Sequence, residues 1–114
     1  PVMPRGAFKL MWDTLNAERE FFGYVKNMTA DGHFYWVFAN ITPDRDASGR
    51  VVGYFSFRRK PRQEAIDVIE PIYREMLAVE KNAGPAAAPD ASIAFLLNKL
   101  NSMGTTYERF ILEL

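Results

Sequence analysis

The segment Phe34–Thr42 (FYWVFANIT) constrains the fold more than any other part of the chain, because it is apolar at almost every position. Successive side chains of a strand point to opposite faces of its sheet. One face of this strand would carry Tyr35, Val37, Ala39 and Ile41, and the other Phe34, Trp36 and Phe38. A sheet with one face in water would alternate more cleanly between apolar and polar residues. We therefore expect both faces of this sheet to be covered.

The neighbouring segments predict a three-stranded antiparallel meander. Phe21–Met28 is rich in aromatic and β-forming residues, and the Asp-Gly pair that follows it favours a tight hairpin turn over residues 30–32. Pro43 is expected to end the second strand. A turn over residues 44–49 then leads into a third strand, Val51–Arg59. With helices before and after this sheet, the predicted fold class is α+β.

A helix is expected over residues 3–19, with one buried face formed by Phe8, Met11, Trp12 and Leu15. From Arg62 the apolar spacing is again helical, with a stripe suited to a partner helix: Ile66, Ile69, Tyr73 and Met76. Pro71 either kinks this helix or starts a new one.

The remainder of the chain predicts two short helices that form a hairpin. Asp90 is expected to cap the first helix, and Thr105 with Glu108 to form a capping box for the second. The chain then divides into a core over residues 1–61, a connector helix over 62–82, an Ala- and Pro-rich linker over 83–89 and the helical hairpin over 90–114.

Composition excludes several classes of function. The 114 residues suffice for one domain, and 14 basic residues offset 14 acidic ones, so we expect no binding to nucleic acid or to a membrane. The chain has no cysteine, which excludes disulfides and thiolate chemistry. It starts at Pro1 with no signal-peptide pattern, and we expect a cytoplasmic piece of a longer protein.

No motif supports catalysis or metal binding, so we do not expect an enzyme. His33, the single histidine, directly follows an Asp-Gly turn and is expected to be exposed. The Asp44–Gly49 turn imitates the start of a calcium loop, but Phe55 stands where such a loop needs its last glutamate. The basic residues of 58–62 are expected to lie in solvent at a strand end, or alternatively to contact a phosphate or a partner.

Polar residues within the aromatic strands are the remaining candidates: Asn27, Asn40, Ser56 and Arg58. They either cap strand ends and face water, or point into a pocket and bind a flat heteroaromatic ligand that stacks on aromatic rings.

An ordered series of short motifs resembles the C-terminal half of a PAS sensor domain, of the type found in bacterial aerotaxis receptors. The motifs are Met3-Pro4, Gly23-x-Val25-Lys26-Asn27, Asp31-Gly32-x-x-Tyr35-Trp36-Val37, Asn40-x-Thr42-Pro43, Gly49-x-x-x-Gly53-Tyr54 and Arg58. The resemblance covers about residues 1–73 and implies an antiparallel sheet that holds a small cofactor, which is FAD in aerotaxis receptors and FMN in light-sensing relatives. The predicted cofactor-binding residues are Phe21, Asn27, Val37, Asn40 and Arg58.

Departures from the family pattern modify this expectation. Val2 stands where aerotaxis receptors carry an Asp, and Phe21 where they carry a Trp. The absence of cysteine excludes a flavin photoadduct. A PAS domain also begins with strands and helices that would precede Pro1, so we expect this form to bind flavin weakly or not at all, and Val51–Arg59 to be an open sheet edge.

The sequence thus predicts a sensory module of bacterial signal transduction, with a redox or oxygen response through a flavin. The alternative is a cofactor-free dimerisation module. In either case we expect a homodimer, formed through an aromatic patch of Trp36, Phe38, Phe55 and Phe57, because leaving these rings in water would forfeit several kcal/mol. The downstream signalling partner is not identified by the sequence.

Overall fold

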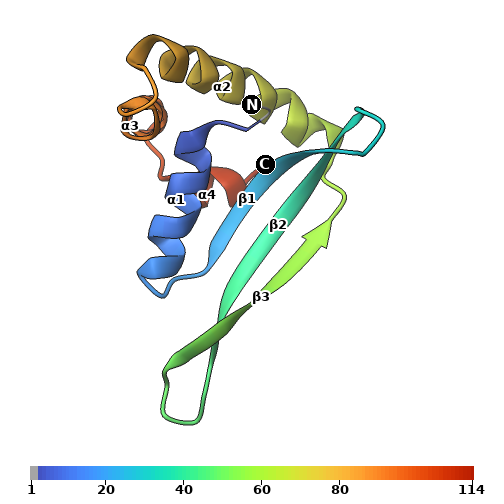
Figure 1. Cartoon of the computed structure of the whole chain (residues 1–114), viewed down its shortest axis with the longest axis vertical. Coiled ribbons are helices and arrows are strands. Elements are labelled where there is room, and N and C mark those ends of the chain that lie inside the picture. The colour runs from blue at the N-terminus through green and yellow to red at the C-terminus, as the bar shows by residue number, and fades with distance from the viewer. Residues whose placement is uncertain (1–2) are drawn as a thin grey trace.

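The computed structural model describes residues 3–114 and shows a three-stranded antiparallel sheet with helices on both faces (Figure 1). The elements in chain order are α1 (Arg5–Asn16), β1 (Phe21–Met28), β2 (Phe34–Arg45), β3 (Val51–Arg59), α2 (Gln63–Ala83), α3 (Ala88–Ser102) and α4 (Tyr107–Leu112). The strands lie in the order β1-β2-β3, and both neighbouring pairs are antiparallel. The predicted meander and fold class are therefore confirmed.

The second strand is longer than predicted, because β2 continues through Pro43 to Arg45. Pro43 lacks an N–H group, yet it is tolerated here because β1 ends opposite Ile41 and leaves one side of β2 without a strand beyond that point. The first hairpin turn lies where the sequence placed it, and the second begins at Asp46, two residues later than predicted, because β2 is longer. Gly32 and Gly49 both have positive φ, at 89° and 87°, which tight turns require and which glycine adopts without strain.

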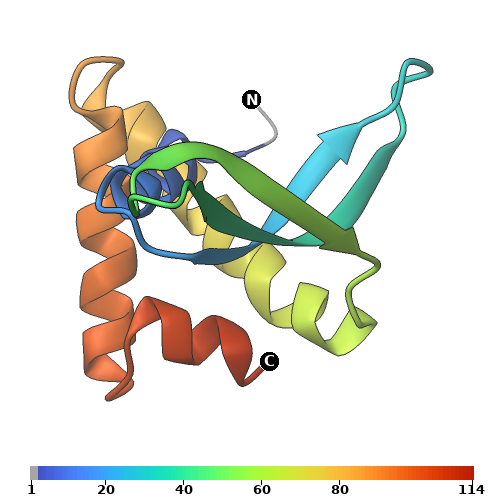
Figure 2. The same ribbon diagram turned by 90° about the horizontal axis from the view of Figure 1, so that it is seen from below.

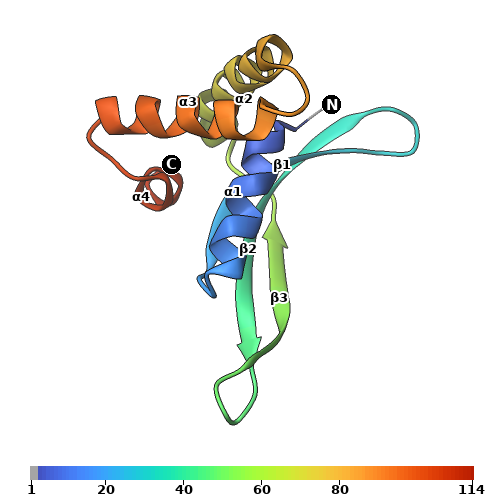
Figure 3. The ribbon, with the colours of Figure 1, turned by 60° about the vertical axis from the view of Figure 1, so that its left-hand side comes forward.

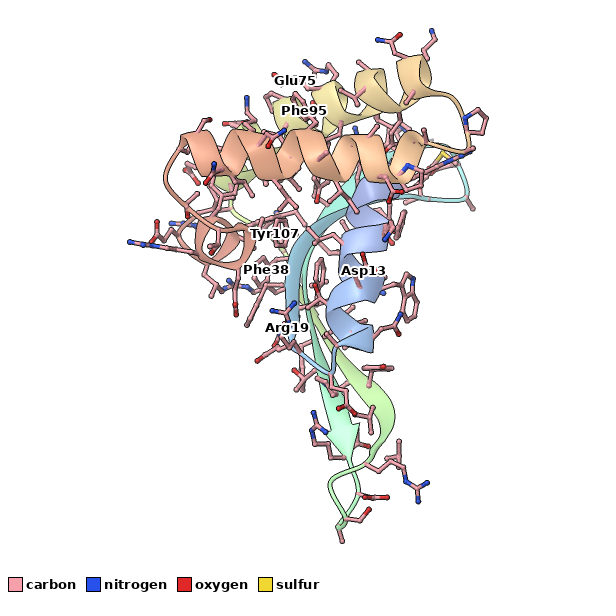
Figure 4. The ribbon with its side chains drawn as sticks, turned by 90° about the vertical axis from the view of Figure 1, so that its left-hand side faces the viewer. Asp13, Arg19, Phe38, Glu75, Phe95 and Tyr107 are labelled. Atoms are coloured by element: carbon pink, nitrogen blue, oxygen red, sulfur yellow. The ribbon has the colours of Figure 1, made fainter. Side chains whose placement is uncertain are left out.

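The two faces of the sheet are covered by different helices. Phe38 on β2 is buried in a cluster with residues of α2 and α4, among them Ile69 and Phe110. Figure 4 shows Phe38 and Tyr107 on the side of the sheet opposite Asp13 of α1. Val37 and Ala39, the neighbours of Phe38 in β2, therefore point to the side of α1, which Figure 3 shows in front of the sheet. We call these sides the α2 face and the α1 face.

The outer edge of β1 is closed by side chains instead of a further strand. The hydroxyl of Tyr73 on α2 donates to the Tyr24 carbonyl at 2.7 Å, and the Lys26 N–H donates to Met3 Sδ at 3.3 Å. These two backbone groups point away from β2 along the edge. The part of the chain that the structure describes places no strand beside the outer edge of β3.

The predicted burial of α1 is wrong at two positions, because Phe8 and Trp12 are 44% and 51% exposed. Gly6, in the first turn, instead packs against α3, and Leu15, in the last turn, is buried. Nine residues separate these two contacts, which places them on opposite sides of the helix. The geometry of α1 is therefore set by a close approach of two helix backbones that no apolar periodicity predicts.

The C-terminal helices form as predicted, with differences at Pro71 and at the starts of α3 and α4. α2 is continuous through Pro71, and its apolar stripe packs within the chain, on the sheet and on the helix α3. α3 begins at Ala88, so Asp90 lies within its first turn and does not cap it. The cap of α4 is Thr106, whose hydroxyl accepts from the Arg109 N–H, one residue later than expected. Figure 2 shows α3 running from the side of α1 to the side of α4.

We expect Gly6→Ala to destabilise the fold by about 1–3 kcal/mol, because the added methyl group must displace one of two packed helices. A Cβ at Gly6 would overlap Ser92 Oγ and lie 3.0 Å from the Ile93 nitrogen and 3.1 Å from the Pro89 carbonyl oxygen. Gly53→Ala is the matched control, since a Cβ there meets nothing within 4 Å. Urea denaturation of both variants tests this, and a gain in stability for Gly6→Ala, as at an exposed helical glycine, would contradict it.

Candidate functional site

Three of the five predicted cofactor-binding residues converge on the α1 face, around Val37. In the register of the sheet, Val37 of β2 lies opposite Val25 of β1, and Asn27 is two residues after Val25, so it points to the same face. Arg58 of β3 lies opposite Ala39 of β2. All of these side chains share one face because each pair is in register. Asn27 and Val37 are half-buried and Arg58 is exposed. Val37 is therefore only partly covered, and one side of it faces the hollow described next.

A hollow of about 760 Å³ opens beside this cluster, in the notch between the end of β3, the edge of β2 and the start of α2. Its lining residues are Tyr35, Trp36, Val37, Arg58, Arg59, Lys60, Pro61, Gln63 and Ile66. The lining combines aromatic rings with three cations and contains no carboxylate. Such a surface suits a flat ligand that carries electronegative or anionic groups.

The structure does not bring Phe21 and Asn40 to this site. Phe21 shares a sheet face with Val25 but lies at the start of β1, where it is buried and its ring stacks on Tyr107 of α4, with centroids 5.9 Å apart. Helix α4 therefore also reaches this face at the start of β1. Asn40 points to the α2 face, where its Nδ2 donates to Glu20 Oε1 at 2.8 Å and to the Phe21 carbonyl at 3.3 Å. Both residues hold the start of β1 in place. Val2, the other position at which the chain departs from the aerotaxis pattern, lies outside the described residues.

The predicted aromatic patch is divided between two environments. Phe38 is buried, and Trp36 is partly buried against the ring of Tyr73, 5.7 Å away between centroids. Phe55 and Phe57 on β3 are 53% and 64% exposed. Helix α2 thus covers the first pair and ends short of the second, so the exposed aromatic surface lies on β3 alone.

Sequence patterns do not identify two buried polar groups. The helical spacing places Tyr73 in an apolar stripe and gives no sign that its hydroxyl donates a hydrogen bond to the backbone of β1. Glu80 is 7% exposed and binds the start of α1. A signal for Glu80 does exist, because it continues the stripe of Tyr73 and Met76 by another helical turn. An acidic residue at a buried stripe position indicates a partner that donates hydrogen bonds.

The remaining sequence candidates have local roles. The side chain of His33 is 82% exposed and lies 3.0 Å from Asp31 Oδ2. Asp46 accepts bonds from the backbone of Ser48 and Arg50 and the Ser48 hydroxyl, which holds the pKa of its carboxyl below the usual value. Among residues 3–114 no group of three or more potential ligands could hold a metal ion. No helix in the same range is long and apolar enough to cross a membrane.

Comparison with known proteins identifies the fold. No family model matches the chain. The light-state structure of the blue-light photoreceptor Aureochrome1 LOV has a TM-score of 0.56 at 17% identity, over 62% of this chain and 56% of that one. A light-oxygen-voltage domain from work on a flavin analogue has a TM-score of 0.55 at 21% identity, over 62% and 53%. The chain therefore has the PAS/LOV-like α+β fold.

Sequence comparison identifies a more specific relative within this fold. Over 78 residues, or 68% of this chain, it is 40% identical to the aerotaxis receptor of Escherichia coli (strain K12). The predicted resemblance to a PAS sensor domain of the aerotaxis-receptor type is thereby confirmed. The matched region spans 15% of the length of that receptor.

The buried tyrosines should make stability fall at alkaline pH. Burial raises the pKa of Tyr73, and it raises the pKa of Tyr107 as well. Since the unfolded chain loses these protons near pH 10, the neutral phenols contribute full stability below about pH 10 and progressively less above it.

We expect Tyr73→Phe to cost about 0.5–1.5 kcal/mol at neutral pH, through the lost bond to Tyr24, and to show a smaller further loss between about pH 8 and pH 11 than the wild type. Denaturation curves at both pH values test this. Tyr35→Phe is the control, because Tyr35 is 46% exposed. An equal alkaline loss with and without the Tyr73 hydroxyl would contradict the assignment.

Proposed function

We propose that this chain is a non-catalytic sensory module of bacterial signal transduction, acting in the cytoplasm, whose α1 face binds a flavin and responds to redox state or oxygen. Val37 and Arg58 line one hollow, and Asn27 lies on the same sheet face; this arrangement carries the proposal. The likeness to an aerotaxis receptor and to light-oxygen-voltage domains supports the same function.

The chemical groups of these three residues suit a flavin ring. Val37 offers an apolar floor for a flat ring, Asn27 offers an amide that both donates and accepts, and Arg58 offers a planar cation for carbonyl oxygens. A bound flavin would supply a redox-dependent change of charge and protonation at this face. The open notch also means that these residues enclose such a ring on one side only, so affinity for this chain should be modest.

Signal output would run through the helices that touch the sheet. α1 lies on the face of the candidate site, and α2 follows β3 directly and packs on the opposite face. A ligand shifts the balance between two arrangements only as far as it binds one of them more tightly. A change in the packing of these helices is therefore the expected response.

Flavin titration tests the site. We expect FMN or FAD to bind this chain with roughly micromolar or weaker affinity, and Val37→Arg to weaken binding at least about tenfold by placing a charge on the apolar floor. His33→Ala is the control and should bind like the wild type, since the exposed His33 does not line the hollow. Quenching of flavin fluorescence measures both. An absence of binding, or equal binding by Val37→Arg, would reject the flavin site and favour the cofactor-free alternative.

We also propose that the chain forms a homodimer through β3. The outer edge of β1 is closed by Tyr73 and Met3, whereas β3 carries Phe55 and Phe57 exposed beside an edge on which the described residues place no strand. A second copy can pair antiparallel with this edge by two-fold symmetry and cover both rings. Trp36 and Phe38, already covered by α2, need not take part.

Phe57→Asp should weaken this dimer at least about tenfold, because the carboxylate would enter the interface. Leu97→Asp on α3 is the matched control, as Leu97 is 45% exposed on a different element. Sedimentation at micromolar concentrations distinguishes the two variants. A wild type that is a folded 13.0 kDa monomer, or an equal response to both substitutions, rejects the interface.

A further inference from the structure

Glu80, in the last turn of α2, is the one charged residue that is buried among residues 3–114. Its carboxylate accepts from the backbone N–H groups of Arg5 and Gly6, each at 2.9 Å, and from the hydroxyl of Ser92 at 2.6 Å. A buried carboxylate is costly unless donors replace its water. Here the donors come from the start of α1 and from α3, so three separate elements meet at one group.

Helix α1 depends on this distant residue for its N-terminal cap. The residue at its N-cap position is Pro4, which offers no side-chain acceptor, and its first turn contains no acidic residue. The first N–H groups of a helix have no partner within the helix and carry its positive partial charge. Glu80 satisfies two of them from a position about 75 residues away in sequence. The first turn of α1 and the end of α2 are therefore coupled energetically.

A second bond fixes α2 to the sheet. The Tyr73 hydroxyl donates to the Tyr24 carbonyl on the outer edge of β1. Seven positions separate Tyr73 from Glu80, which is about 10 Å along the helix. α2 is thus held to the sheet at Tyr73 and to α1 at Glu80. Because α1 lies on the candidate-site face, any displacement of α1 must either carry the end of α2 with it or break the bonds to Glu80.

We propose that Glu80 is a positioning residue that passes displacements of α1 to the end of α2 and to α3, with Tyr73 as the fixed point. The physiological role of this coupling rests on the proposed sensory function, since α1 lies on the sheet face of the candidate flavin site. Its test needs no flavin, so failure of the flavin site and failure of this coupling are separate results.

Leu15→Ala supplies the displacement, because Leu15 is 2% exposed and lies at the end of α1 far from Glu80. Amide hydrogen exchange over residues 81–92 is the readout, measured by mass spectrometry with and without Glu80→Gln. With Glu80 intact, Leu15→Ala should speed exchange in this segment at least about threefold, and with Glu80→Gln it should add less than about 1.5-fold. A merely structural cap would leave the two effects independent and their fold-changes multiplicative.

Glu75→Gln is the matched control. Glu75 also links α2 to α3, through an exposed ion pair with Lys99 at 3.6 Å, but it does not reach α1. The effect of Leu15→Ala should survive this substitution unchanged. An equal response in the presence and absence of Glu80→Gln, or no response with Glu80 intact, overturns the proposal. If Glu80→Gln does not fold, Glu80→Asp, whose carboxylate is one methylene short, replaces it: reduced coupling supports the proposal and full coupling overturns it.

Discussion

The burial of β2 on both faces is the constraint on which the other elements depend. The strand lies between two neighbours and presents Phe38 to one side and Ala39 to the other, 8% and 3% exposed. A strand of this kind needs cover above and below, since each large apolar side chain left in water costs about 1.5–3 kcal/mol. α2 covers one side and α1 the other, while α4 packs against β1. The β2–β3 hairpin, whose turn extends beyond the helices in Figure 3, is correspondingly exposed.

A few polar contacts then join the helices that cover the two faces of the sheet. Tyr73 binds α2 to the edge of β1, and Glu80 binds α2 to the first turn of α1. The close approach at Gly6 allows α1 and α3 to pack backbone to backbone, and Ser92 completes the set of donors to Glu80. These contacts connect residues that are 12 to 75 positions apart in sequence. They tie the C-terminal helices to the part of the chain that resembles a sensor domain.

The sequence predicted the sheet well because strand periodicity and turn chemistry are local. Asp31-Gly32 and Ser48-Gly49 determine the turns, and the alternation along β2 determines its faces. It predicted helix faces less well, because the burial of Phe8 and Trp12 depends on which element packs beside α1, and that choice rests on the small size of Gly6. The candidate-site residues came from the family resemblance and not from alternation. The strand register brings Asn27, Val37 and Arg58 to one face, and alternation along β2 puts Asn40 opposite Val37. The long-range role of Glu80 has only a weak local signature.

The basic run at the end of β3 shows how alternation assigns different roles to adjacent residues. Arg58 lies on the α1 face beside Val37, whereas the Arg59 guanidinium lies over the ring of Phe38 on the α2 face, 4.6 Å from its centroid. Arg59 thereby extends the aromatic cover that α2 provides, and its positive charge is stabilised by the ring. Lys60 follows at the rim of the hollow. All three of these cations line the hollow, so the same short segment both covers Phe38 and supplies the positive charge of the candidate site.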